Sequence, residues 1–370
     1  MKIALVGPLP PLRGGIAHYN LSLLETLQER GVELLTVPFR KLYPDILFPG
    51  SNQFEPDRMP AEVEGGLLAW RPDTWRHALK QIERFKAERV VYHHWHPFFV
   101  PLYRYLMRYH ASHGHIVIAH NVLPHEHQTI GKWLNRSLFR KARRVIVGAG
   151  SEAELLQRIS LGTKAAVMPH PVYDRFRCDL ARTKAREDRR YPVDRPVLLH
   201  AGLVREYKGL DLLLNAFHKI ESQPEPVLHV AGEFYDNPEK YTAAAHAGPA
   251  CERIWIENRY LSDEELSRLL VAADAVVLPY RHGTQSGIAM AALANGTPVI
   301  ASAVGALKDV IVDGENGYLV EPRSVDQLHD RIQRFLDEMI PLPTEKRESI
   351  ANTTMKRYSW EALAELLLEE

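Results

Sequence analysis

Two basic side chains, Arg205 and Lys208, stand in one short turn of the sequence. The apolar run 196–202 before them is typical of a buried strand, and residues 210–217 after them are typical of a helix. Turns of this kind lie at the carboxyl edge of a sheet, where open α/β folds bind ligands. A guanidinium that binds oxygens in pairs, beside a mobile ammonium, suits a diphosphate better than a single carboxylate. A solvated charged turn is the alternative that this motif alone leaves open.

A second strand-to-helix connection follows about 80 residues later in the chain. Thr284, Ser286 and Gly287 lie between a short apolar strand pattern, 275–278, and an apolar helical stretch, 288–294. They can leave backbone N–H groups at the amino end of that helix, where the helix dipole favours negative charge. An ordinary N-cap, with Ser286 satisfying the first turn and nothing bound, is the alternative. Two such connections in one half of the chain predict a shared phosphate ligand.

Six segments along the chain carry a resemblance to a known family: Gly14-Gly15, residues 120–125, the turn with Arg205 and Lys208, and residues 232–235, 295–302 and 314–320. In their order and spacing they resemble the retaining nucleotide-sugar glycosyltransferases of family 4 (group 1). The resemblance implies the GT-B fold, an α/β architecture of two Rossmann-like domains that face each other across a cleft, each with a parallel sheet. It also implies that the C-terminal helix returns to the first domain.

The resemblance implies a role for each residue of the candidate site. Arg205 and Lys208 would stabilise the departing diphosphate, and His120 would contact or orient the donor sugar; a core histidine at a strand end is the alternative for His120. Gly14 and Gly15 would let the backbone approach a ligand, unless they form a plain turn. The expected substrate-binding residues are Gly14, Gly15, Glu233, Tyr260, Thr284, Gln285, Ser286 and Gly287.

One departure from the family pattern concerns two glutamates, eight positions apart, that this class usually carries around the phosphate-binding helix. Gly283 and Ala291 occupy those positions here, and neither replaces a carboxylate. Backbone amides together with Gln285 are expected to take over the contacts to the sugar and the ribose.

The expected reaction is sugar transfer from a nucleoside diphosphate sugar to a hydroxyl of a saccharide or lipid-linked acceptor, with retention, in cell-surface polysaccharide or glycoconjugate synthesis. No metal or other cofactor is expected, since no Asp-x-Asp pair stands in a loop to hold a divalent cation. Two alternatives stay open. A GT-B sugar-nucleotide epimerase would need acid and base groups that are not evident, and a non-catalytic sugar-nucleotide-binding protein would explain Gly283 and Ala291.

The domain division predicted from the sequence is 1–172, joined by a final helix within about 352–370, and 173–351. Residues 168–172, with two prolines, resemble the interdomain crossing. Apolar or β-branched runs predict parallel strands throughout both halves. Between about residues 40 and 72 periodicity is lost, which predicts loops.

The overall composition argues against some partners and cellular locations. Forty-six basic residues balance 46 acidic ones, which argues against a nucleic-acid partner bound through bulk charge. Two cysteines without metal-ligand spacing indicate free thiols, and no apolar run resembles a signal peptide or membrane helix, so a cytoplasmic protein is expected.

Two local clusters have structural alternatives. The histidines and aromatic residues near 92–99 are expected to pack in the core and form a wall on the acceptor side rather than bind metal, because His93 and His94 point to opposite strand faces. A helix with basic residues between 136 and 144 is compatible with peripheral contact to anionic lipid at the inner face of the membrane, or with plain solvation.

Overall fold

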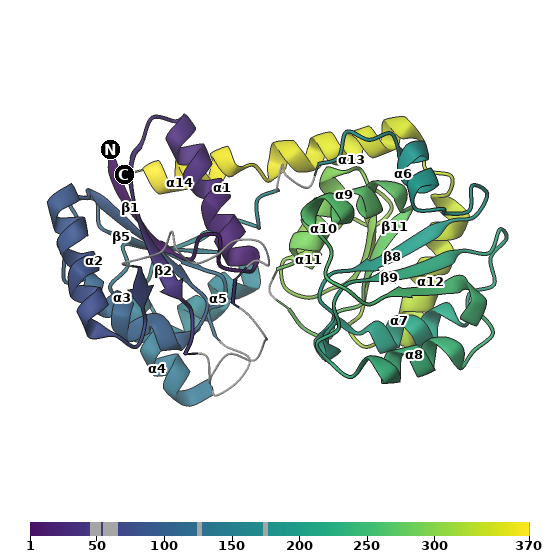
Figure 1. Ribbon diagram of the computed structural model, residues 1–370, viewed down its shortest axis with the longest axis horizontal. Helices are drawn as coiled ribbons and strands as arrows, with labels where there is room; N and C mark the ends of the chain where they lie inside the picture. The colour runs from purple at the N-terminus through teal and green to yellow at the C-terminus, as the bar shows by residue number, and fades with distance from the viewer. Residues whose placement is uncertain (45–52, 55–65, 124–127, 173–176, 284, 370) are drawn as a thin grey trace. The chain divides into compact units, whose positions relative to one another are not determined.

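The computed structural model describes residues 1–44, 53–54, 66–123, 128–172, 177–283 and 285–369. Its contacts divide the chain into two compact units, Met1–Pro169 with Trp360–Glu370, and His170–Ser359 (Figure 1). The division predicted from the sequence was 1–172 with 352–370, and 173–351. The returning segment is therefore shorter than predicted, because the helix before it, α13 (Thr344–Arg357), packs on α10 (Gly287–Ala294) in the second unit.

The first unit is built on a seven-stranded parallel sheet of order β3-β2-β1-β4-β5-β6-β7. Its strands are β1 (Lys2–Gly7), β2 (Glu33–Lys41), β3 (Leu67–Leu68), β4 (Arg89–His94), β5 (His115–Ala119), β6 (Arg144–Val147) and β7 (Ala165–Val167). Strand order reverses between β1 and β4, which is where open α/β sheets bind ligands. The loops expected between residues 40 and 72 include the end of β2 and the short strand β3; positions 45–52 and 55–65 lie outside the described residues.

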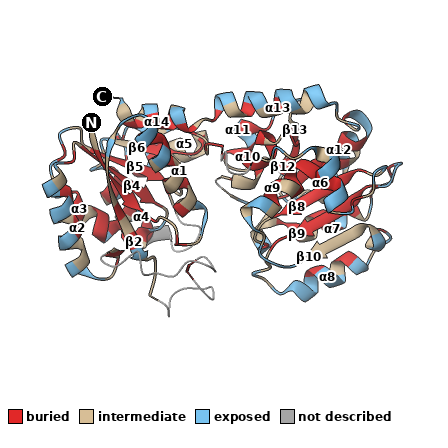
Figure 2. Cartoon of the chain, turned by 45° about the horizontal axis from the view of Figure 1, so that its top comes forward, coloured by how far each residue is buried: buried red, intermediate tan, exposed pale blue. Residues whose placement is uncertain are grey.

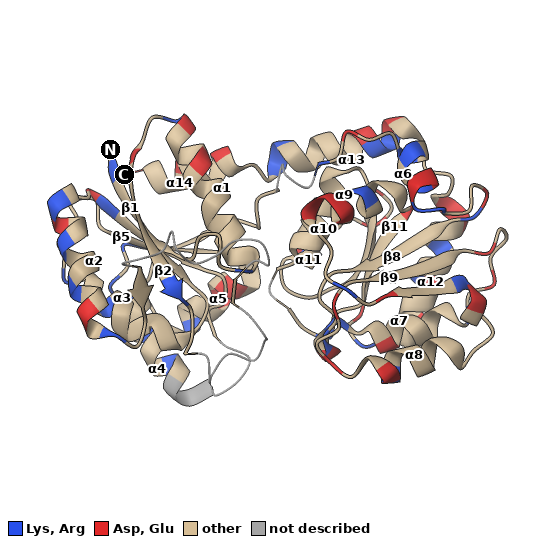
Figure 3. Ribbon diagram, in the orientation of Figure 1, with Lys and Arg blue, Asp and Glu red and all other residues tan. Residues whose placement is uncertain are grey.

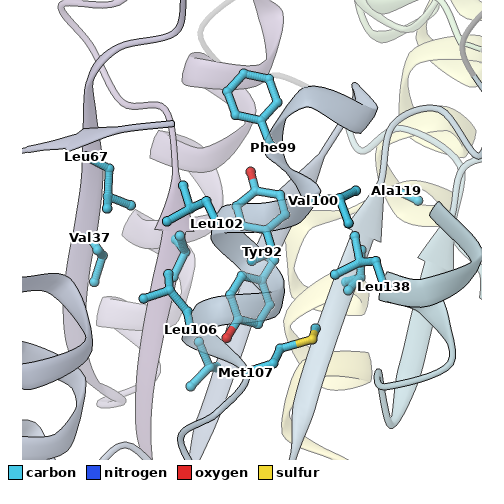
Figure 4. Packing of buried hydrophobic residues seen from close by; sticks show 14 of the residues in the cluster. Val37, Leu67, Tyr92, Phe99, Val100, Leu102, Leu106, Met107, Ala119 and Leu138 are labelled. Carbon is cyan, nitrogen blue, oxygen red and sulfur yellow. The ribbon is translucent and has the colours of Figure 1, made fainter. Parts of the chain in front are cut away.

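Helices cover both faces of this sheet. Among the described residues they are α1 (Gly15–Glu29), α2 (Pro72–Phe85), α3 (Val100–Leu106), α4 (Gln128–Phe139), α5 (Gly150–Ile159) and α14 (Trp360–Leu368), and the 3₁₀ turn η3 (Pro97–Phe99) precedes α3. The helix α1 packs against α14, and α3 packs against both α2 and α4. Side chains of α3 and α4 meet those of the sheet in an apolar layer around Tyr92 (Figure 4).

Two arginines hold the returning helix α14 on the first unit. Arg89 is fully buried and donates to the carbonyl oxygens of Leu367 and Glu369, the latter at 2.9 Å. Arg144 donates to the Leu366 carbonyl at 2.8 Å and pairs with the Glu369 carboxylate. Cations at a helix C-terminus satisfy its last carbonyls and complement its dipole. The C-terminal helix is thus part of the first unit, as predicted.

The second unit has a six-stranded parallel sheet of order β10-β9-β8-β11-β12-β13. Its strands are β8 (Val197–Ala201), β9 (Val227–Ala231), β10 (Ile254–Glu257), β11 (Ala275–Leu278), β12 (Val299–Ser302) and β13 (Gly317–Val320). Figure 2 shows the inner strands buried and β10 only half-buried, as befits an edge strand. The reversal of strand order falls between β8 and β11.

Two groups of helices flank this sheet. One comprises α7 (Leu210–Phe217), α8 (Pro238–His246) and α12 (Val325–Glu338), whose apolar side chains share a core with β8 and β9. The other comprises α6 (Arg182–Asp188), α9 (Asp263–Ala272), α10 and α13, which pack on one another in sequence-distant pairs, and α11 (Leu307–Val310) lies by β12. Two 3₁₀ turns, η5 (Glu206–Lys208) and η6 (Cys251–Arg253), interrupt the loops. Both cysteines are free thiols.

Candidate active site

The turn after β8 places Arg205 and Lys208 at the carboxyl edge of the second sheet. Gly202 follows the strand with φ +98°, Lys208 closes η5, and Gly209, with φ +69°, precedes α7. Both glycines hold left-handed backbone conformations that other residues adopt only with strain. The two basic side chains therefore project from the predicted strand-to-helix turn, beside the reversal of strand order.

Arg281 fastens this turn to the connection after β11. Its backbone N–H donates to the Tyr207 carbonyl at 2.7 Å, and its guanidinium donates to the Glu206 carbonyl at 2.7 Å. The same guanidinium pairs through two nitrogens with the Asp211 carboxylate, at 2.9 and 2.5 Å. Such forked pairs fix geometry as well as adding energy. The two connections singled out from the sequence thus lie side by side in the second unit.

Gly209 sits where the two connections touch most closely. A Cβ at this position would lie 2.1 Å from the Pro279 carbonyl oxygen, which is backbone and cannot move aside. We expect Gly209→Ala to lower the free energy of unfolding by at least about 2 kcal/mol, because it adds this clash to a strained φ. Chemical denaturation measures the loss. Gly150→Ala is the control, since a Cβ there meets nothing and little change is expected; equal stabilities of the two variants would contradict this account.

The Lys208 ammonium lies over the end of β8. Its Nζ is 5.6 Å from the centre of the Tyr280 ring, and a Cβ built on Gly202 would lie 3.4 Å from both Nζ and Ile288 Cγ1. Among the described residues no carboxylate pairs with it. Burial lowers the pKa of Lys208, and the nearby Arg205 guanidinium lowers it further. An unpaired, partly desolvated cation is poised to gain from an anionic ligand.

The Lys208 charge affects the protonation of the neighbouring His200. It is fully buried on β8, and its Nδ1 lies 2.9 Å from the Val277 carbonyl oxygen. Burial, with a contribution from the Lys208 charge, lowers the pKa of His200 to about 4. The imidazole is therefore neutral at physiological pH and adds no second charge beneath the lysine.

The first turn of α10 begins beside Lys208. Ser286 is its N-cap: the hydroxyl accepts from the Ala289 N–H at 3.3 Å and lies 3.3 Å from the Tyr280 hydroxyl. The capping alternative is therefore realised, yet within the described part of this loop the Gly287 and Ile288 amides have no acceptor. Gln285 and Ser286 line a cavity of about 10 Å³, the room that one water needs. Thr284 lies outside the described residues.

The loops after β9 and β10 extend the same edge. Val204 and Phe234 pair as an isolated bridge, and the Val204 N–H donates to the Glu233 carbonyl at 2.9 Å. Arg205 lies 4.9 Å above the centre of the Tyr235 ring, a cation–π contact that orients the guanidinium. Tyr260, in the loop after β10, is 46% exposed. Glu233 and Tyr260 thus follow neighbouring strands of the second sheet, β9 and β10.

The two positions without glutamates differ in their surroundings. A Cβ at Gly283 would meet only a Tyr280 ring carbon at 3.7 Å, an ordinary contact, so this position has room for a side chain. Ala291 is fully buried in α10. A carboxylate at position 291 would be desolvated here, which is costly without a partner.

In the first unit, the predicted residues lie around the reversal between β1 and β4. Gly14, with φ +121°, precedes α1, and a Cβ on either Gly14 or Gly15 would meet nothing within 4 Å. His120 follows β5, and its Nε2 lies 3.1 Å from Nδ1 of His93 at the end of β4. His94 points the other way, with Nε2 3.1 Å from Asn135 Oδ1, so the prediction of opposite strand faces is confirmed. In the described part of the chain, no three His, Cys, Asp or Glu side chains gather as metal ligands would.

Sequence reasoning missed three side chains that shape the site: Asp211, Tyr235 and Arg281. The acid and the guanidinium that bind each other are 70 positions apart, so neither alone marks the contact. Arg281 could have been found by one feature of the sequence. It is a basic residue shortly after a predicted strand, and the same feature identified Arg205 and Lys208.

The comparisons with known proteins agree with this geometry. Residues 181–357, just under half of the chain, match the family model described as glycosyl transferases group 1. The D-inositol 3-phosphate glycosyltransferase of Xylanimonas cellulosilytica is 38% identical over 149 residues, covering 38% of this chain and 34% of that protein. The MMP alpha-(1->4)-mannosyltransferase of Mycolicibacterium hassiacum is 32% identical over 161 residues, or 42% and 38% of the two chains. The chain thus spans between about a third and a half of the curated relatives it matches.

Solved structures resemble nearly the whole chain. Sucrose-phosphate synthase from Thermosynechococcus elongatus has a TM-score of 0.74 at 20% identity, over 99% of this chain and 97% of that one. Anabaena Alr3699/HepE, solved with UDP and glucose, has a TM-score of 0.69 at 15% identity, over 99% of both chains. The predicted α/β fold of two Rossmann-like, parallel-sheet units is confirmed as the GT-B fold, and the match to the group 1 model falls within the second unit.

Proposed function

We propose that this protein is a retaining glycosyltransferase that transfers a sugar from a nucleoside diphosphate sugar to a hydroxyl of a saccharide or lipid-linked acceptor. The observation that carries the proposal is the Lys208 ammonium over Gly202, beside the first turn of α10 and without a carboxylate partner among the described residues. The group 1 domain match and the curated relatives, a glycosyltransferase acting on D-inositol 3-phosphate and a mannosyltransferase by their names, support the reaction class.

The chemistry follows from where charge develops. The bond between the anomeric carbon and the diphosphate oxygen breaks, and negative charge accumulates on that oxygen. Lys208, Arg205 and the Gly287 and Ile288 amides would meet this charge with fixed cations and dipoles, which need no reorganisation during the reaction. The acceptor oxygen bonds to the same face of the anomeric carbon, and its proton passes to the departing phosphate oxygen. This scheme needs neither a protein nucleophile nor a metal.

The first unit would supply the acceptor side. Gly14 and Gly15 would let backbone approach the bound substrates, and His120 would contact a donor-sugar hydroxyl. In the second unit, Glu233, Tyr260 and Gln285 would complete the nucleotide and sugar contacts, because they lie along the same sheet edge or at the α10 loop.

Product formation tests this proposal. We expect one nucleoside diphosphate sugar from a panel, together with a saccharide or polyol phosphate acceptor, to give an NMR-detected glycoside with retained anomeric configuration. EDTA is expected to leave the rate unchanged. A new sugar isomer from the donor alone would indicate an epimerase, and calorimetric binding without product from a broad acceptor panel would indicate a non-catalytic binding protein. Either result would contradict the proposal.

A basic surface on α4 supports a lipid-linked acceptor at the inner face of the membrane. Between residues 104 and 144 the chain has eight Lys or Arg and one Asp or Glu. Lys132, Arg136 and Arg140 repeat every four positions and are exposed, and Trp133 beside them is 69% exposed (Figure 3). Basic side chains near an anionic surface contribute about 1 kcal/mol each, and an interfacial tryptophan adds apolar burial. None of the described helices could span a membrane.

Vesicle sedimentation tests this surface. We expect the protein to bind phosphatidylglycerol-containing vesicles at low salt more than pure phosphatidylcholine vesicles. The combined variant Trp133→Ser, Arg136→Glu should lose most of this binding, because it removes the apolar anchor and reverses a charge. The matched variant Arg76→Glu, Lys80→Glu changes exposed basic residues on α2 and should retain it. Equal losses in both variants would contradict a surface centred on α4.

A further inference from the structure

Two buried side chains at the reversal of strand order in the first unit have polar atoms that the proposed reaction does not use. Asn20 of α1 is 1% exposed and His93 of β4 is fully buried. Both press on the end of β1: a Cβ at Gly7 would lie 2.9 Å from His93 Cδ2 and 3.0 Å from Asn20 Nδ2. Only a glycine leaves room for these two side chains to meet at this place.

Each of these residues makes one firm contact besides. The Asn20 amide Nδ2 donates to the Pro8 carbonyl at 2.9 Å, which fixes the amide orientation and ties α1 to the start of the loop that carries Gly14. The Tyr103 hydroxyl donates to the His93 carbonyl at 2.6 Å, which fixes the end of β4. With Nδ2 engaged, Oδ1 is the Asn20 side-chain atom that remains to be satisfied.

The remaining atoms are complementary. Asn20 Oδ1 and His93 Nε2 are both buried, and neither has a hydrogen-bond partner among the described residues. Burying an unpaired polar atom costs free energy, so an arrangement that satisfies both is favoured. An amide oxygen can only accept, and an imidazole nitrogen donates when it carries the proton. With a proton on His93 Nε2, a hydrogen bond between these two atoms would satisfy both.

The other nitrogen of His93 then has a defined role. Burial lowers the pKa of His93 to about 3, so the ring is neutral and carries a single proton. With that proton on Nε2, Nδ1 is an acceptor, and it lies 3.1 Å from His120 Nε2. His120 must then donate from Nε2 to satisfy this contact.

We propose that Asn20 and His93 are positioning residues that fix His120 with its proton on Nε2, through a chain of hydrogen bonds from Asn20 Oδ1 to His93 and on to His120. The His120 Nδ1 is then an acceptor, suited to receive a hydrogen bond from a sugar hydroxyl. In catalytic and metal-binding sites, a group that hydrogen-bonds one nitrogen of an imidazole fixes the ring orientation and the position of its proton in the same way. The consequence for catalysis rests on the proposed function. The predicted positions of the protons on His93 and His120 do not depend on that function.

Aromatic packing holds the same ring in place. Tyr19 of α1 meets His120 edge-on, with ring centres 4.9 Å apart, and meets His93 at 5.6 Å. Trp360 of α14 meets Tyr19 edge-on at 4.9 Å. The C-terminal helix α14 therefore supports His93 and His120 through Tyr19, so Trp360 helps to position these histidines as well as to pack the core.

Histidine tautomers measured by NMR test the proposal directly. In the full chain labelled with ¹⁵N-histidine, long-range proton–nitrogen spectra at neutral pH should show His93 and His120 each protonated on Nε2. A proton on His93 Nδ1, or an unprotonated Nε2 on His120, would overturn the proposal. This result needs no variant and no substrate, so it is distinct from a failure to detect sugar transfer.

Variants extend the test to function. His93→Leu should lower kcat about 10- to 100-fold with a smaller effect on KM. Replacing a residue that hydrogen-bonds a functional histidine has effects of this size. His93→Asn should recover much of the loss, because its side-chain oxygen can accept where Nδ1 did. His94→Leu is the matched control: this histidine is equally buried but bonds Asn135 on the opposite face. Equal losses of kcat in His93→Leu and His94→Leu, or no recovery in His93→Asn, would overturn the positioning role.

Discussion

Replacement of Lys208 by methionine is expected to lower kcat about 100- to 1000-fold, the effect of removing one preorganised donor from a developing oxyanion. Methionine keeps the length and packing of the side chain over the Tyr280 ring but removes the charge. The thermal midpoint should stay the same or rise, because the variant relieves a partly desolvated cation that no described carboxylate pairs with. Steady-state kinetics and thermal denaturation of the same samples measure the two effects.

A second lysine of the same unit provides the control for this variant. Lys240 also lies over a tyrosine ring, with Nζ 4.7 Å from the centre of Tyr241, but it is exposed and belongs to α8 rather than to the turn after β8. Lys240→Met should leave kcat within about twofold, since it removes a cation–π contact of comparable geometry and no ligand contact. Equal losses in the two variants would contradict the assignment of Lys208 to the leaving group.

Replacement of Asp274 by asparagine is expected to cause the largest loss of stability, about 3–5 kcal/mol of unfolding free energy, as when one partner of a buried ion pair is removed. The carboxylate, just before β11, is nearly buried and pairs with three guanidiniums. They belong to Arg182, Arg186 at 3.0 Å and Arg347 at 3.5 Å. Burial, with the nearby Arg182 charge, already lowers the pKa of Arg347 to about 10. Without the carboxylate, α6 and α13 would repel each other at the sheet.

An exposed ion pair in the same unit provides the control for this loss of stability. Asp326 pairs with Lys219 at 2.9 Å in full contact with solvent, where such pairs contribute little. Urea denaturation should therefore show no measurable change in Asp326→Asn. If Asp274→Asn were as stable as Asp326→Asn, the buried guanidinium cluster would not hold the second unit together.

The strands and the site turn were predictable because each is encoded locally. The β-branched run 115–119 and the apolar run 227–231 form the buried strands β5 and β9, since strands buried on both faces show continuous apolar sequence. Lys208 and Ser286 lie in the loops that lead from such strands into the next helix, and parallel strands bring their carboxyl ends to one edge. The short edge strand β3 was missed, because two residues carry no periodicity.

The contacts that complete the site could not be predicted, because they join residues far apart in the chain. Arg281 and Asp211 pair across 70 positions, and His93 and His120 across 27. In each case the contact depends on sheet order, which periodicity does not reveal. The bond between His93 and His120 requires β4 to lie beside β5 and its residues to face α1. The roles of the remaining predicted site residues are proposals that ligand binding can test.

A crystal structure with a bound nucleoside diphosphate tests the central claim most directly. The ligand would be whichever of UDP, GDP and ADP raises the thermal midpoint most. We predict that its terminal phosphate lies within hydrogen-bond distance of Lys208 Nζ, about 3 Å, and accepts from the Gly287 and Ile288 amides. A diphosphate bound elsewhere, beyond the reach of the Lys208 side chain, would contradict the account.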